Sequence, residues 1–156
     1  MRIKKVLAAN RGEIAIRIIR ACQELDIEVV SIYSEADRDN LFYRLADESV
    51  KLRGKELRKT YLNMKKIIRA AKKTGCDAVH PGYGFLSERP EFAAMCEEEG
   101  VIFIGPSSGT METAGNKAVV KEIMREAGVP VLPSIESTDM EELASFGSKT
   151  GYPLIV

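Results

Sequence analysis

The chain of 156 residues contains no tryptophan, a single histidine and few aromatic residues, which make up 6% of the sequence. Proteins that hold nucleic-acid bases by stacking rely on aromatic side chains, so this composition disfavours that class. Basic and acidic residues are equal at 23 each, which gives a net charge of zero. Such a balance indicates neither nucleic acid nor a membrane as a partner.

The cysteines are few and scattered. Cys22, Cys76 and Cys96 form no C-x-x-C pair and no cluster with the histidine, so the sequence predicts no metal site. Unpaired cysteines among apolar residues are typical of core positions in a reducing compartment. The apolar run near the start covers only residues 6–9, and no run is long enough to span a bilayer. We therefore expect a cytoplasmic protein.

Apolar segments alternate with amphipathic ones over about the first 105 residues, a size ordinary for one domain. Strands are expected at 3–9, 27–33, 48–52, 77–80 and 101–104. Helices are expected at 13–25, in a short segment through Leu45, from Thr60 as the N-cap to Gly75, and from Pro90 to about Gly100. This alternation predicts an α/β fold with a doubly wound, Rossmann-like parallel sheet.

The pattern changes after this domain. Further helices are expected at 107–114, from Asn116 as the N-cap to Gly128, and from a capping box of Thr138 and Glu141 to Lys149. Residues 129–135 are expected to form an extended connector, and residues 152–156 to begin a strand. A strand at a chain end lacks its neighbours, so we expect a fragment truncated inside a second domain. The alternative is a natural chain whose last strand pairs at a sheet edge.

The segment Asn10-Arg11-Gly12-Glu13 joins the first expected strand to the first helix. Free amides at such a turn form a common anion site. The dinucleotide fingerprint G-x-G-x-x-G is absent, although Glu35 lies near the end of the second strand, where a ribose contact is expected. On these residues alone a structural turn is slightly favoured. A dinucleotide-binding oxidoreductase domain remains an open alternative.

The stretch from His80 to Glu88 is the most informative part of the chain, because it places the only histidine, two glycines and two aromatic residues in one strand-to-helix turn. Open α/β sheets bind ligands at the carboxyl ends of their strands, and glycines let the backbone approach a ligand. Alone, the histidine is more typical of a structural position. Glu88 either faces this crevice or complements the dipole of the next helix from its first turn.

Lys117 lies in the first turn of the helix expected after Asn116. A cation there opposes the helix dipole at a cost of about 0.3–1 kcal/mol, which a bound phosphate would reverse. The residues alone support an exposed lysine and a phosphate contact equally.

Arg17, Arg20 and Glu24 share one face of the helix expected at 13–25, and this face is charged where the helix's other stripe is apolar. Arg20 and Glu24 have the spacing of an ion pair. The face is either solvated or a polar contact between two copies of the chain. A non-catalytic dimerisation module is therefore the second open alternative.

Taken together, a series of motifs resembles the N-terminal part of biotin carboxylase, the ATP-dependent component of acetyl-CoA, propionyl-CoA and pyruvate carboxylases. The motifs are, in chain order, Ala9-Asn10-Arg11-Gly12-Glu13-Ile14-Ala15, Ala36-Asp37-Arg38-Asp39, Leu45-Ala46-Asp47-Glu48, Tyr61-Leu62-Asn63, His80 to Glu88, and Phe103-Ile104-Gly105-Pro106. The resemblance implies a Rossmann-like domain at 1–114 and the truncated start of an ATP-grasp domain at 115–156. Asn116 stands where the family commonly has aspartate, and it retains the ability to cap a helix.

The resemblance also implies an activity and its participants. In this family MgATP activates bicarbonate as carboxyphosphate, and the carboxyl group passes to biotin on a carrier domain. ATP, Mg²⁺ and biotin are thus the implied cofactors, and a biotin carboxyl carrier, a carboxyltransferase and a second copy of the enzyme are the implied partners.

The same resemblance implies roles for residues of this chain. Lys117 matches an ATP-binding lysine, and Arg17, Arg20 and Glu24 match a dimer contact. The implied cleft-lining residues are His80, Gly82, Tyr83, Gly84 and Glu88. No catalytic and no metal-binding residue is expected here, and we predict that the chain has no carboxylase activity by itself.

Overall fold

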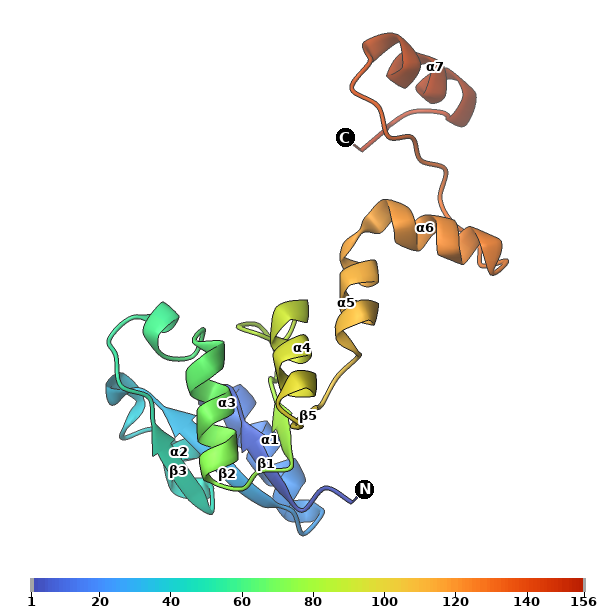
Figure 1. Ribbon diagram of the computed structural model, residues 1–156. Helices are drawn as coiled ribbons and strands as arrows, with labels where there is room; N and C mark the ends of the chain where they lie inside the picture. Colours follow the sequence, from blue (N-terminus) through green and yellow to red (C-terminus); the bar gives the residue numbers. More distant parts are fainter. Residues whose placement is uncertain (1, 156) are drawn as a thin grey trace. The chain divides into compact units, whose positions relative to one another are not determined.

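The computed structural model describes residues 2–155, which divide between Gly115 and Asn116 into two compact units. The first unit contains one five-stranded parallel sheet (Figure 1). Its strands are β1 (Lys5–Ala8), β2 (Glu28–Tyr33), β3 (Glu48–Lys51), β4 (Ala78–His80) and β5 (Ile102–Phe103). The spatial order β3-β2-β1-β4-β5 confirms the predicted doubly wound α/β fold.

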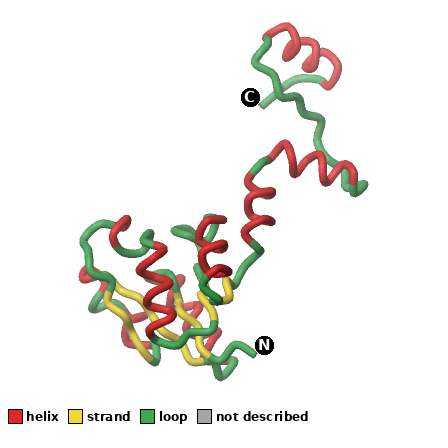
Figure 2. Tube along the Cα trace, in the orientation of Figure 1, coloured by secondary structure: helices red, strands yellow, loops and turns green. Residues whose placement is uncertain are grey.

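Helices cover both faces of the sheet (Figure 2). They are α1 (Gly12–Glu24), α2 (Leu41–Leu45), α3 (Met64–Lys73) and α4 (Pro90–Glu98), with 3₁₀ turns η1 (Glu35–Asp37) and η2 (Leu57–Lys59). Side chains alternate along the strands, so Leu7 packs in the core under α3 and α4, whereas Val6 and Ala8 pack under α1 and α2. This two-sided burial is what a parallel sheet requires.

The beginning of α3 differs from the prediction. Asn63, and not Thr60, is the N-cap, because its side chain accepts a hydrogen bond from the Lys66 amide at 3.0 Å. The Thr60 hydroxyl instead donates to the Glu56 carbonyl at 2.9 Å and closes the η2 turn. Thr60 and Tyr61 are therefore buried in the segment that precedes the helix.

Helix α5 (Ser108–Gly115) ends the first unit and contacts α4, where the Ser108 hydroxyl donates to Glu97 at 2.9 Å. The second unit contains α6 (Lys117–Glu126) and α7 (Met140–Thr150). The predicted Asn116 cap of α6 is confirmed.

Two other predictions for the second unit fail. Asp139 caps α7 in place of Thr138, since its side chain accepts from the amides of Glu141 and Glu142 at 2.7 and 3.2 Å. The predicted strand is wrong for residues 152–155, and Val156 lies outside the described residues. A strand needs a neighbour for its backbone hydrogen bonds, and the described part of this unit contains none.

Within residues 2–155, no helix combines the length and the apolar character that crossing a bilayer requires.

Candidate functional site

Three loops meet where the strand order reverses between β1 and β4. They follow the carboxyl ends of β1, β2 and β4 and contain Asn10, Asp37 and the His80–Glu88 turn. Because the strands are parallel, these ends lie on one edge of the sheet. The reversal is the topological switch point at which open α/β sheets form their ligand crevice.

Asn10 ties two of these loops together. The residue is 2% exposed, and its side-chain amide nitrogen donates to the carbonyls of Pro81 and Tyr83 at 2.7 and 2.9 Å. Its side-chain oxygen Oδ1 accepts a hydrogen bond from the Arg11 backbone amide at 2.9 Å. One buried amide therefore sets the distance between the turn after β1 and the turn after β4.

The glycines of the His80–Glu88 turn have the left-handed conformation that favours glycine, with φ of +71° at Gly82 and +68° at Gly84. A Cβ at Gly82 would lie 2.5 Å from the Ile14 side chain, whereas a Cβ at Gly84 would meet nothing within 4 Å. Gly82 is thus packed against α1. Tyr83 lies between the glycines and is 78% exposed, so the turn presents its ring to solvent.

His80 holds the beginning of this turn. Its Nδ1 accepts the Gly82 amide at 3.0 Å, and burial lowers the pKa of the imidazole below its ordinary value. An acceptor nitrogen carries no proton, so this hydrogen bond assigns the neutral form with the proton on Nε2. The geometry gives His80 a structural part in the crevice.

A cation lies over two aromatic rings in the same crevice. The rings of Tyr61 and Phe85 stack at 5.5 Å between centroids, with 8° between their planes. The Arg11 guanidinium carbon lies 5.8 Å from the Tyr61 centroid and 6.0 Å from that of Phe85. These separations are at the limit of a cation–π interaction. The Arg11 side chain remains 46% exposed, so a cationic group borders the crevice.

Asp37 anchors the loop after β2. This buried carboxylate accepts from the hydroxyls of Ser34 and Tyr61 at 2.5 and 2.7 Å, and Arg11 lies 3.5 Å away. Its other donor is Asn40, at 3.2 Å. The Tyr61 hydroxyl accepts in turn from the Ser34 amide at 3.0 Å, and burial together with Asp37 raises the pKa of Tyr61. The network fixes the loop after β2 and the Tyr61 ring over which the Arg11 guanidinium lies.

Most of the sequence-predicted crevice residues, His80, Gly82, Tyr83 and Gly84, come together in this turn. Glu88 is exposed and precedes Arg89, the N-cap of α4. The first-turn acid of α4 is Glu91, which forms an ion pair with Arg89, so the alternative role of Glu88 as a first-turn acid is wrong. Sequence reasoning considered Asn10 and Arg11 only as part of a turn and assigned no site role to Asp37, Tyr61 or Phe85, although all five lie in the motifs that carry the resemblance.

Glu35, the expected ribose contact of a dinucleotide site, lies in η1 and is exposed. Its carboxylate forms ion pairs with Lys51 and Arg38, and the hydrogen bond from Lys51 lowers its pKa. The carboxylate is therefore already paired with cations.

Lys117 begins α6 and lines a cavity of about 260 Å³ within the second unit. Lys121 and Arg125 follow on the same stripe of α6, where Glu122 also lines the cavity and pairs with Arg125, and Ser134 to Glu136 form the other wall. The side-chain oxygen Oδ1 of Asn116 accepts hydrogen bonds from the backbone amides of Ala118 and Val119 at 3.1 and 3.2 Å. Because these amides are occupied, an anion here would contact mainly the cationic side chains.

Arg17, Arg20 and Glu24 are exposed on α1. Among residues 2–155, no ion pair joins Arg20 to Glu24. The three side chains are thus free to contact another surface.

Comparison with known proteins gives this architecture a family. The family model described as biotin carboxylase, N-terminal domain, matches residues 2–111. The chain belongs to this family. Over 156 residues it is 50% identical to biotin carboxylase 1 of Bacillus subtilis (strain 168), which covers 99% of the chain and 35% of that protein.

Solved biotin carboxylase structures have the same fold. The biotin carboxylase domain of a thermophilic 2-oxoglutarate carboxylase bound to bicarbonate superposes with a TM-score of 0.91 at 46% identity, over 98% of this chain and 35% of that one. The dimer of this domain from Hydrogenobacter thermophilus, in complex with MgADP, ADP and bicarbonate, gives 0.86 at 46% identity, over 98% and 34%. The chain thus spans about a third of the length of these relatives.

Proposed function

We propose that this chain is the N-terminal portion of an ATP-dependent biotin carboxylase. The observation that carries the proposal is the 50% identity to a biotin carboxylase along 99% of the chain. In the proposed reaction ATP phosphorylates bicarbonate to carboxyphosphate with release of ADP, and the carboxyl group then passes to a ureido nitrogen of biotin with release of phosphate.

The first unit supplies one wall of the active-site cleft in this proposal. His80, Gly82, Tyr83 and Gly84 form that wall, with Glu88 at its end. The hydrogen bonds of Asn10 and the Asp37–Tyr61 pair support it, because they fix the loops on either side of the switch point. The exposed ring of Tyr83 is the group of this wall best placed to contact a ligand.

The second unit begins the ATP-grasp domain, and Lys117 contacts the phosphates of ATP. The cavity beside Lys117 supports this role, because its α6 wall includes Lys117 and Lys121, whose side chains are donors that suit phosphate oxygens. Arg125 lies on the same wall and is paired with Glu122. These cations do not suit a metal ion. Within residues 2–155 no group of three or more His, Cys, Asp or Glu side chains converges on one point, so we place the Mg²⁺ ligands in the remainder of the protein.

The remaining participants follow from the same proposal. A biotin carboxyl carrier delivers biotin, a carboxyltransferase accepts the carboxyl group, and Arg17, Arg20 and Glu24 contribute to a dimer contact. The dimeric Hydrogenobacter thermophilus relative supports a dimer. We place the reaction in the cytoplasm.

Two measurements test the proposal. In the protein that carries this chain, ADP release should depend on bicarbonate and increase with free biotin, while the 156-residue chain alone should show no bicarbonate-dependent ATP cleavage. Titration with ATP and NAD distinguishes the proposed biotin carboxylase from a dinucleotide-binding oxidoreductase domain, because a biotin carboxylase should bind ATP and not NAD. Binding of NAD without ATP would overturn the proposal.

A further inference from the structure

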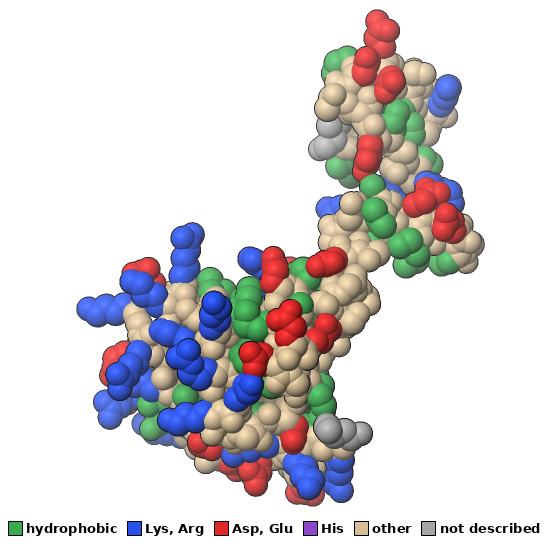
Figure 3. Space-filling model, in the orientation of Figure 1, with side chains coloured by type: hydrophobic (Ala, Val, Ile, Leu, Met, Phe, Trp, Pro, Cys, Tyr) green, Lys and Arg blue, Asp and Glu red, His purple; other side chains and the backbone are tan. Residues whose placement is uncertain are grey.

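The positive charge of the chain is concentrated in one segment. Residues 51–73 carry ten of its 23 basic residues and a single acid, Glu56, an excess of nine charges in a chain of zero net charge. The ten are Lys51, Arg53, Lys55, Arg58, Lys59, Lys65, Lys66, Arg69, Lys72 and Lys73. Figure 3 shows Lys and Arg side chains gathered over the part of the first unit that carries β3 and α3, with Asp and Glu over α4.

Helix α3 forms a cationic ridge in this surface. Lys65, Arg69 and Lys73 recur at every fourth residue and define the α3 ridge. All three are exposed, and among residues 2–155 none of them has an ion pair or a side-chain hydrogen bond. By contrast, Lys72 pairs with Glu99 and Lys66 donates to the carbonyls of Arg53 and Lys59. The α3 ridge therefore holds like charges at neighbouring positions, and within residues 2–155 none of the three is paired with an acid.

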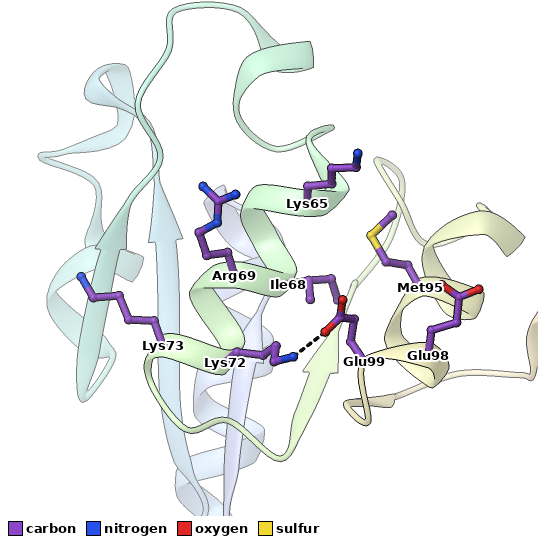
Figure 4. Close-up of a pocket in the computed structure, with 8 residues that line it drawn as sticks. All are labelled: Lys65, Ile68, Arg69, Lys72, Lys73, Met95, Glu98 and Glu99. Carbon is purple, nitrogen blue, oxygen red and sulfur yellow. Dashed lines mark hydrogen bonds and ion pairs between the residues drawn. The ribbon is translucent and has the colours of Figure 1, made fainter.

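A groove with an apolar floor lies on each side of the ridge. One groove, of about 700 Å³, separates α3 from α4, and Ile68 and Met95 lie between the two helices (Figure 4). The other, of about 210 Å³, lies against β3 and includes Val50 and Leu52. Arg69 and Lys73 line both grooves. The surface therefore alternates apolar and cationic strips.

We propose that the α3 ridge docks an acidic segment of a partner protein whose carboxylates pair with Lys65, Arg69 and Lys73 and whose apolar side chains enter the adjoining grooves. Charge complementarity with the cationic ridge requires a negatively charged segment on the partner. Nucleic acid fits less well, because the apolar side chains in the two grooves, such as Ile68 and Met95, suit the apolar side chains of a peptide and not a phosphate backbone. The aromatic residue within the basic segment, Tyr61, is fully buried and provides no stacking platform. This inference is independent of the proposed reaction.

The test uses the 156-residue chain and a short fluorescein-labelled peptide in which Glu residues flank two Leu residues, with binding followed by fluorescence anisotropy. The test variant replaces the ridge with glutamine: Lys65→Gln, Arg69→Gln and Lys73→Gln. The control replaces three other exposed cations of the first unit: Arg2→Gln, Lys4→Gln and Arg44→Gln. Both variants lose three charges, and far-UV circular dichroism confirms that each is folded.

The acidic peptide should bind the wild-type chain and the control variant with equal affinity. Loss of the ridge should weaken binding about tenfold, since three pairs of about 0.5 kcal/mol each together match the roughly 1.4 kcal/mol that a factor of ten requires. Replacing the two Leu residues of the peptide with Ser should also weaken binding. Absence of binding at low salt, or equal losses in the two variants, would overturn the proposal. So would tighter binding of a single-stranded oligonucleotide or of vesicles containing phosphatidylserine.

Discussion

Replacement of Gly82 by alanine measures how tightly the His80–Glu88 turn is fixed against α1. The added Cβ would lie 2.5 Å from Ile14 Cγ2, 2.9 Å from Asn10 Nδ2 and 3.2 Å from Ile18 Cδ1. The left-handed backbone, with φ at +71°, costs an alanine about 1 kcal/mol. Overlap with buried side chains costs about a further 2 kcal/mol. We therefore expect Gly82→Ala to lower the free energy of unfolding of the first unit by about 3 kcal/mol.

Gly84→Ala is the matched control. Gly84 has nearly the same φ, +68°, and its Cβ would meet nothing within 4 Å. Only the backbone term applies, so the expected loss is about 1 kcal/mol. The difference between the two variants isolates the packing of the turn against Ile14, Asn10 and Ile18.

Urea unfolding provides the assay, with the NMR signal of His80 as a reporter for the first unit because the chain has no other histidine. For a slope of about 2 kcal/mol/M, the midpoint should fall by about 1.5 M in Gly82→Ala and about 0.5 M in Gly84→Ala. Equal shifts would refute the reasoning, because they would mean that the turn does not pack against α1.

Three further predictions concern the groups around the crevice. Tyr61→Phe removes the hydroxyl that donates to buried Asp37 and should lower the free energy of unfolding in urea by about 2 kcal/mol. The control is Tyr43→Phe, whose hydroxyl makes no hydrogen bond within residues 2–155 and whose loss should change stability by less than about 0.5 kcal/mol. Equal losses in the two variants would contradict the network around Asp37. The pKa of His80, measured by NMR titration, should lie below 6.5. Stability should fall as pH drops below 6.5, because the imidazole of the unfolded chain binds a proton while that of the native chain stays neutral. A pKa above 6.5 would refute the assigned hydrogen bond. Burial raises the pKa of Cys96 to about 12 and also raises that of Tyr61, so the native chain retains protons that the unfolded chain releases above about pH 9. Stability should therefore decline from about pH 9 upward, less steeply in Tyr61→Phe, and a flat profile would show that these groups are not buried.

The hydrophobic pattern was sufficient to predict the sheet and its main helices. Apolar residues recur with a period of two in strands and about 3.6 in helices, and these periods can be read from short stretches of sequence. The structure accordingly has β1, α1 and β2 within a few residues of their predicted bounds. The pattern was less reliable at helix ends. Thr60 and Asn63 are both capable N-caps, and the η2 turn, which uses the Thr60 hydroxyl, decides between them. Leu25 fits the apolar stripe but follows the last turn of α1 and is 65% exposed.

The candidate site was only partly predictable for a related reason. The glycines of the His80–Glu88 turn signal a special backbone within a short stretch, and the strand-end position follows from the β–α alternation. The contacts of Asn10 with Pro81 and of Tyr61 with Asp37 join residues 71 and 24 positions apart, so no local pattern reports them. Only the three-dimensional structure shows that these polar side chains are buried and paired.

Bicarbonate-dependent release of ADP, measured in the protein that carries this chain with Lys117 intact and replaced by glutamine, tests the central claim most directly. Lys149→Gln, an exposed lysine on α7, is the matched control. The account predicts activity that requires bicarbonate, a KM for ATP raised at least about tenfold by Lys117→Gln through loss of a charged phosphate contact, and no change in the control. Absence of bicarbonate-dependent ADP release from the unaltered protein, or an unchanged KM in Lys117→Gln, would contradict it.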